Sequence, residues 1–137
     1  MINAIQTALS GLVASTKRVE ASASNIANIG TAGSLDDAGN APYAPISTVQ
    51  QTQTDSQGNA TGVTAENLPR ENAFVPAYDP DSPFANSEGF VGVPNVNLAE
   101  EAVNLKLAEA TYKANIAVLE TVNELSDELL SIFDDEA

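Results

Sequence analysis

Residues 2–29 read INAIQTALSGLVASTKRVEASASNIANI, and apolar or small side chains recur along this stretch at alternating steps of three and four. These positions are Ile2, Ile5, Leu9, Leu12, Thr16, Val19, Ala23 and Ile26. A seven-residue repeat of this kind is typical of a helix that packs along a coiled-coil seam. Gly30 follows the stretch and is predicted to end the helix in the left-handed conformation that glycine accepts.

A second helix is predicted over residues 97–133. Asn97 is a candidate N-cap, and Glu100, three residues later, is suited to a capping box. A broad, mostly apolar stripe follows at Leu105, Ala108, Tyr112, Asn115, Leu119, Val122, Leu125, Leu129 and Ile132. At about 1.5 Å per residue the two helices would be roughly 40 and 50 Å long, which is hard to hide within a compact globule of this size.

The middle of the chain cannot be helical. All seven prolines lie between residues 42 and 94, and seven of the eight glycines lie between residues 30 and 92. Short strands are predicted at residues 46–54 and 62–65, with a hairpin turn around residues 55–59. Because this middle segment is poor in apolar residues, it is not expected to form a core of its own.

The sequence therefore predicts a mainly α fold, in which long N- and C-terminal helices pair as a coiled coil around a small β-hairpin and loop insert. Residues 1–30 and 95–137 would form one coiled-coil domain, and residues 31–94 would form the Pro/Gly-rich insert. One set of apolar residues is predicted to pack between the two helices within one subunit: Ile5, Leu9, Leu12, Val19 and Ile26 against Leu105, Tyr112, Leu119, Val122 and Leu129. The Ala-rich faces left over would join neighbouring subunits.

Composition excludes several functions. The chain has 137 residues with five Lys or Arg, nineteen Asp or Glu, no His and no Cys, and a formal charge of −14. It therefore lacks the side chains of a Cys/His zinc site, a cysteine nucleophile or a Ser-His-Asp triad. Its charge repels nucleic acid and anionic lipid, and no apolar run approaches the length that spans a bilayer. No catalytic activity, cofactor or metal is expected, and the acidic row Glu120, Glu124 and Glu128 is interpreted as a solvated helix face.

Both ends of the chain carry motifs of a known family. Residues 8–12 read ALSGL and residues 24–31 read SNIANIGT; residues 89–97 read GFVGVPNVN and lead into EEAVNL at residues 100–105. These blocks resemble the axial proteins of the bacterial flagellum, which include the rod and hook subunits, and the second block is most similar to short subunits of the proximal rod. The residues that match the family motifs are Asn25, Ala27, Asn28, Thr31, Pro94, Asn95, Val96, Asn104 and Asn115.

The resemblance implies a structural subunit of the flagellar basal-body rod that assembles helically through its terminal helices and transmits motor torque. Its partners would be further copies of itself, other rod proteins and the flagellar type III export apparatus. It would lie in the rod that crosses the periplasm and would be exported without a cleaved signal peptide, since the N-terminus lacks a basic signal region. Two alternatives stay open: another axial subunit of the same family, and a soluble acidic helical chaperone or adaptor.

Overall fold

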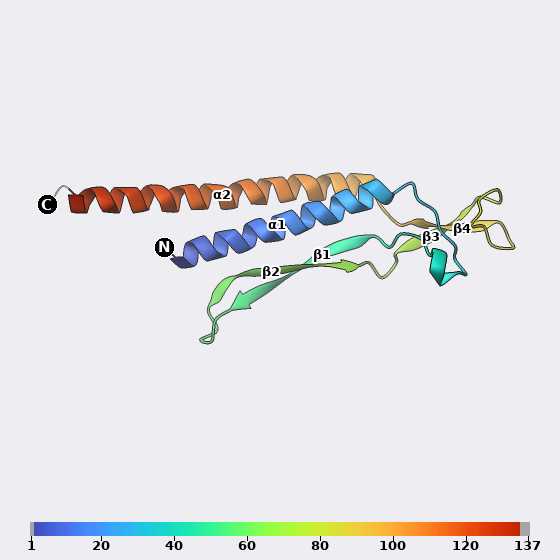
Figure 1. The fold of residues 1–137 in the computed structure, drawn as a ribbon, viewed down its shortest axis with the longest axis horizontal. Coiled ribbons are helices and arrows are strands. Elements are labelled where there is room, and N and C mark those ends of the chain that lie inside the picture. Colours follow the sequence, from blue (N-terminus) through green and yellow to red (C-terminus); the bar gives the residue numbers. More distant parts are fainter. Residues whose placement is uncertain (1, 135–137) are drawn as a thin grey trace.

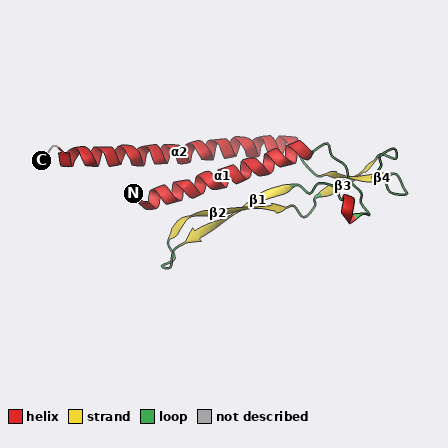
Figure 2. Ribbon diagram, in the orientation of Figure 1, coloured by secondary structure: helices red, strands yellow, loops and turns green. Residues whose placement is uncertain are grey.

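The computed structural model describes residues 2–134 and shows an elongated molecule with two long helices along one side (Figure 1). The elements follow one another as α1 (Ile2–Asn28), a short 3-10 helix (Ala38–Asn40), β1 (Ile46–Thr54), β2 (Ala60–Pro69), β3 (Phe74–Tyr78), β4 (Phe90–Pro94) and α2 (Leu98–Asp134). Helix α1 runs antiparallel to α2, and the β1–β2 hairpin lies along the opposite side of α1 (Figure 2). The two helices confirm the helices predicted from the sequence. Strand β1 has the predicted bounds, residues 46–54, and forms the predicted hairpin with β2.

The mainly α fold class, however, was wrong. The segment between the helices forms two separate two-stranded antiparallel sheets, β1–β2 and β3–β4, instead of one small hairpin. Strand β2 is ten residues long, where the sequence indicated only residues 62–65. The long hairpin contacts α1 along much of its length, so it shares in the packing of the helical part of the chain. The fold is therefore a three-layer arrangement of helix, helix and hairpin, with a second small sheet at one end.

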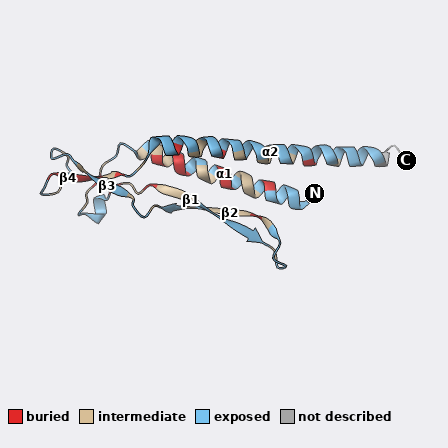
Figure 3. Cartoon of the chain, turned by 180° about the vertical axis from the view of Figure 1, so that it is seen from behind, coloured by how far each residue is buried: buried red, intermediate tan, exposed pale blue. Residues whose placement is uncertain are grey.

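Small side chains let α1 pack tightly on two sides. Ala8, Ser15 and Ser22 are buried at heptad spacing on the side of α2, where the Ser15 hydroxyl lies 3.0 Å from that of Thr111. The side facing the hairpin is held by polar contacts: the Thr7 hydroxyl donates to the carbonyl of Thr61, and the amide of Val63 donates to the Ser10 hydroxyl. Figure 3 shows the buried residues of α1 between these two neighbours.

The two helices meet closely at Gly11. A Cβ atom at this position would lie 2.6 Å from the amide atoms of Asn115 on α2, well inside van der Waals contact. We expect Gly11→Val to lower the free energy of unfolding by about 1–3 kcal/mol, because the Asn115 side chain, which donates to the carbonyl of Thr111, or α2 itself must move to accept the valine. Urea denaturation followed by circular dichroism would measure the change.

Gly30→Ala is the matched control for this substitution, because a Cβ at Gly30 meets nothing within 4 Å. It should leave the free energy of unfolding within about 0.5 kcal/mol of the native value. Replacing Asn115 by Ala in the Gly11→Val background should recover part of the loss. A Gly11→Val protein as stable as the native chain would show that the helices do not meet at this point.

The helix ends explain part of the sequence motifs. At α2, the Asn97 side chain accepts hydrogen bonds from the amides of Ala99 and Glu100, which confirms the predicted N-cap. The left-handed Gly30 predicted after α1 was wrong, because the positive-φ glycines of the described residues are Gly58, Gly62 and Gly89. Instead, both the amide and the hydroxyl of Thr31 donate to the carbonyl of Asn28. The amide and the hydroxyl of Thr31 therefore satisfy this helix-terminal carbonyl together. In a left-handed glycine cap, backbone amides alone would satisfy such carbonyls.

Local hydrogen bonds fix the turn of the first sheet and the position of the second. In the β1–β2 turn the Asp55 carboxylate accepts from the amides of Gln57 and Asn59, and Gly58 adopts a φ of 84°. A hydrogen bond from the Asn59 side chain lowers the pKa of Asp55. At the other end, the small β3–β4 sheet is joined to the chain after α1 by a bridge between Gly33 and Gly92. Both ends of the insert thus have a defined backbone conformation.

Candidate functional site and assembly surface

A buried polar cluster joins the helices to the hairpin. Asn25 and Glu101 are 0% and 1% exposed, and the Asn25 side-chain amide donates to the Glu101 carboxylate at 2.9 Å. The same amide donates to the carbonyl of Ile46 at 2.8 Å, while the Asn25 oxygen accepts from the Ile46 amide at 2.9 Å and from the Tyr43 hydroxyl at 3.1 Å. One asparagine therefore binds α2 and the first residue of β1 at once.

Arg70, directly after β2, completes this cluster. Its guanidinium donates to the Glu101 carboxylate at 2.5 Å and lies 3.8 Å from Glu100, and its backbone amide donates to the carbonyl of Pro45. A carboxylate buried as deeply as Glu101 is tolerated only when a cation and hydrogen-bond donors surround it. We call the group Asn25, Tyr43, Arg70 and Glu101 the junction cluster; it ties α1, α2 and both strands of the hairpin together.

The apolar residues predicted to pack between the helices lie in two different environments. Val122 is buried, and Leu12, Ile26, Leu105 and Leu119 are half-buried. The other five are exposed in the single chain: Ile5, Leu9, Val19, Tyr112 and Leu129. The seam inside one chain is therefore made mainly by small and polar side chains, and it differs from the seam that the heptad pattern predicted.

Much of the apolar repeat of α1 faces outward. Ile2 is 72% exposed and Leu9 is 55% exposed, and Ile5 and Val13 are exposed beside them. We call these four residues the α1 apolar face. Helix α2 also carries exposed apolar residues along its length: Val103, Leu107, Tyr112, Val118, Leu125, Leu129, Leu130 and Ile132. Exposed apolar surface of this extent marks a site of association with other chains.

Helix α2 extends beyond its partner. The contacts of Asn25 with Glu101 and of Ser15 with Thr111 set an antiparallel register, in which the N-terminus of α1 lies opposite residue 124. The rest of α2 projects past α1, as Figure 1 shows. We call residues 125–132 the α2 overhang. It carries Leu125, Leu129, Leu130 and Ile132 exposed.

Comparison with known proteins identifies the family of this chain. A family model described as the C-terminal part of the flagellar basal body rod proteins FlgEFG matches residues 87–132, which include β4 and nearly all of α2. The flagellar basal-body rod protein FlgC of Salmonella typhimurium is 34% identical over 134 residues, covering 96% of this chain and 97% of the relative. The chain belongs to the FlgC family of flagellar basal-body rod proteins.

Other FlgC proteins match over nearly the whole chain as well. FlgC of Escherichia coli O157:H7 is 32% identical over 134 residues, covering 96% of this chain and 97% of its own length. FlgC of Bacillus subtilis is 28% identical over 144 residues, covering 95% of this chain and 96% of its own length. The chain is accordingly a structural subunit of the flagellar basal-body rod. Neither of its helices, within the residues the structure describes, is long and apolar enough to cross a membrane.

Of the nine residues predicted to match the family motifs, eight lie around the end of the helix pair where α1 ends and α2 begins, and Asn115 lies farther along α2. Asn25 belongs to the junction cluster, Asn28 donates from its side chain to the carbonyl of Ser24, and Thr31 ends α1. Asn95 donates to the carbonyl of Asn72, and Asn115 lies against Gly11. Ala27 is exposed, Pro94 is buried, and Val96 and Asn104 are half-buried. The asparagines therefore hold helix ends and neighbouring segments together, and none of them lies in a group of His, Cys, Asp or Glu that could hold a metal ion among residues 2–134.

Sequence reasoning missed Arg70 and Glu101. The pair Glu100-Glu101 reads as two solvated acids, and nothing near it in sequence shows that one of them is buried. The available signal was that Arg70 is the single Lys or Arg between residues 31 and 94. A lone cation within an acidic segment is a candidate partner for a buried carboxylate, although its partner cannot be named before the fold is known.

Surface ion pairs contribute differently from the junction cluster. The hydrogen bonds of Lys113 and Lys106 to Glu109 lower the pKa of that carboxyl from 4.5 to about 2. The Glu109 side chain is exposed, so solvent screens the pairing and it adds little to stability. Glu109 has two lysines beside it, whereas the described part of α2 after Lys113 carries Asp and Glu but no Lys or Arg. The C-terminal half of α2 is therefore an acidic helix with exposed apolar residues.

Proposed function

We propose that this FlgC-family chain builds the rod by helical self-assembly, and that α1 and α2 supply the contacts between subunits. Residues 1–30 and 95–137 would act as one helical unit near the axis, with residues 31–94 packed outward or between neighbours. The observation that carries the proposal is the α1 apolar face together with the exposed apolar residues of α2. These surfaces are unfavourable in water and lie on the helices that the family shares.

The energetics of the helix pair support association. The seam within one chain is lined by Ala, Ser, Gly and Asn, which contribute little apolar area. Burying a large apolar side chain is worth about 1.5–3 kcal/mol, so most of the hydrophobic free energy of these helices is still available for contacts between chains. The five predicted packing residues that are exposed here, from Ile5 to Leu129, would then be buried between subunits.

The proposal also covers the partners of the chain and the transmission of motor torque. Copies of this chain and other rod proteins would surround each subunit, and the flagellar type III apparatus would deliver it to the growing rod across the periplasm. Motor torque would pass through the contacts between helices, while the junction cluster keeps helices and hairpin from shearing apart within a subunit. The role is structural, without catalysis.

Electron cryo-microscopy of isolated basal bodies tests this function. We expect density for the helix pair close to the rod axis, repeated by a helical operation, with the apolar faces of α1 and α2 covered by neighbouring chains. Mass spectrometry of the same preparation should identify the chain among the rod proteins. Its absence from intact basal bodies would overturn the proposal and would favour the soluble adaptor.

A further inference from the structure

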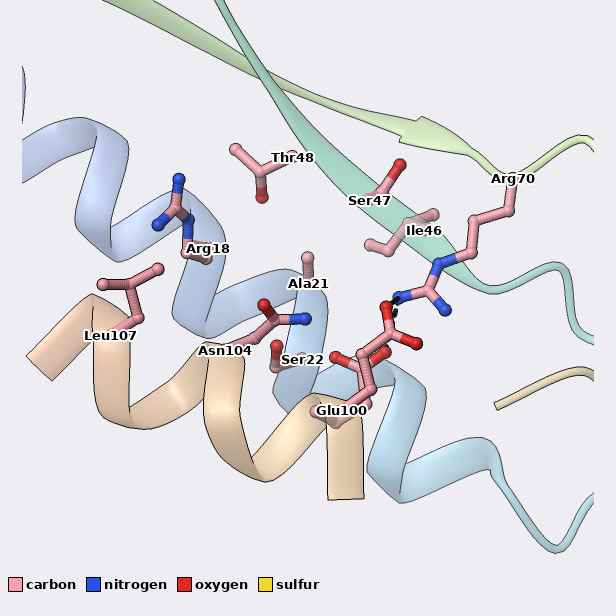
Figure 4. A pocket seen from close by; sticks show the side chains of 11 residues that line it. Arg18, Ala21, Ser22, Ile46, Ser47, Thr48, Arg70, Glu100, Asn104 and Leu107 are labelled. Carbon is pink, nitrogen blue, oxygen red and sulfur yellow. Dashed lines mark hydrogen bonds and ion pairs between the residues drawn. The ribbon is translucent and has the colours of Figure 1, made fainter. Parts of the chain in front are cut away.

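A cleft of about 370 Å³ opens where α1, α2 and β1 meet. Figure 4 shows Arg18 and Leu107 at one end of it, and Arg70 with Glu100 at the other. Ser22, Thr48 and Asn104 lie between the two ends. The cleft thus offers a cation beside an apolar side chain at one end, while the charges at the other end already pair with each other.

Arg18 differs from the other cations of the chain. All five Lys and Arg residues lie within the described residues 2–134, and four of them pair with carboxylates: Lys17 with Glu20, Arg70 with Glu100 and Glu101, and Lys106 and Lys113 with Glu109. Among the carboxylates that the structure describes, none lies within 4 Å of Arg18. In a chain of net charge −14, a half-buried arginine without an acidic neighbour is free to bind a carboxylate from outside.

The α2 overhang carries the matching chemistry. Glu128 lies on the helix beside Leu125 and Ile132, which are exposed one turn before it and one turn after it. The last cation of α2 is Lys113, which lies 15 residues before Glu128 and is therefore too far along the helix to pair with this carboxylate. The overhang therefore presents an acid between two apolar side chains, and the cleft presents Arg18 beside Leu107, which is itself exposed.

We propose that Glu128 on the α2 overhang of one copy docks on Arg18 in the cleft of the next copy, with Leu125 packing on Leu107. The inference rests on the self-assembly proposed above and names one contact that would carry it. From Leu107, which lies at the Arg18 end of the cleft, to Glu128 is 21 residues, or about 32 Å along α2, so a copy displaced by roughly that distance along the axis meets the cleft. Because the two surfaces are different, the contact is head-to-tail, and it extends into an open helix when the rotation between successive copies does not close a ring.

Charge reversal on the purified, full-length chain is the first test. We expect Arg18→Glu to weaken self-association about tenfold at low salt in sedimentation equilibrium, with a smaller difference at high salt. Lys17→Glu is the matched control, since it makes the same change of net charge one residue away at a lysine already paired with Glu20. Combining Arg18→Glu with Glu128→Arg should restore association to within about threefold of native.

Cross-linking tests the contact without relying on charge. Because the chain has no cysteine, Arg18→Cys and Glu128→Cys can be made in separate molecules, mixed and treated with a short bismaleimide. We expect a covalent dimer from this mixture, and none when Asp79→Cys, on the far β3–β4 end, replaces Glu128→Cys. Circular dichroism of each variant shows whether it has folded.

Three results would overturn the inference: equal effects of Arg18→Glu and Lys17→Glu, no recovery with Glu128→Arg, or no cross-link between copies. The proposed function is tested by a different observation, the presence of the chain in isolated basal bodies. Failure of this inference and failure of the proposed function can therefore be distinguished.

Discussion

Replacing Arg70 by Ala is expected to lower the free energy of unfolding by about 3–5 kcal/mol. The substitution removes the cation from Glu101, which is 1% exposed and then keeps only the hydrogen bond from Asn25. An uncompensated charge in that position destabilises the folded state far more than the loss of an exposed ion pair does. Thermal or urea denaturation followed by circular dichroism would measure the change.

Two variants make the result specific to the junction cluster. Lys106→Ala removes a lysine that is 82% exposed and pairs with Glu109, and it should cost no more than about 1 kcal/mol. Adding Glu101→Gln to Arg70→Ala removes the stranded charge and should recover part of the lost stability. If Arg70→Ala behaves like Lys106→Ala, then Glu101 is solvated in solution and the junction cluster does not hold the hairpin on the helices.

Periodicity and helix breakers made most of the secondary structure predictable. Pro and Gly confine the non-helical segment, the heptad repeat marks the first helix, and a broad apolar stripe marks the second, so the bounds of α1 and α2 lie within one residue of the predicted stretches. The fold class was wrong because β3 and β4 were not predicted and only residues 62–65 of β2 were, so the extent of the hairpin formed by β1 and β2 was underestimated. Their stability depends on pairing with each other and on docking against α1, and neither is visible in local sequence.

The packing inside one chain was harder to predict than its elements. An apolar stripe shows that a face is to be buried, but it does not show which chain buries it. Here Ile5 and Leu9 are exposed, whereas Ala8, Gly11 and Ser15 on the neighbouring face approach α2. Small residues carry almost no hydrophobic signal and yet permit the closest contacts. The junction cluster likewise depends on residues up to 76 positions apart, which no local pattern can pair.

A single charge on the α1 apolar face should prevent rod assembly while leaving the subunit folded. Leu9 is 55% exposed at the middle of this face, so Leu9→Asp disturbs little within the chain and should change its free energy of unfolding by less than about 1 kcal/mol. In the assembled rod the same position would be covered. There the substitution forfeits about 1.5–3 kcal/mol of apolar burial per contact and adds the cost of burying a charge.

Because every 1.4 kcal/mol is a tenfold change in affinity, the loss at one contact weakens association at least tenfold, and it recurs at each subunit of the rod. In a strain that lacks its own copy of the gene, Leu9→Asp should give no motility and no rod in images of basal bodies, with normal amounts of folded subunit. Leu9→Met is the matched control, because it keeps an apolar side chain of similar volume and should restore swimming. Normal rods built from Leu9→Asp subunits would mean that α1 faces solvent in the assembly, and that subunit contacts must be sought along α2 and the hairpin instead.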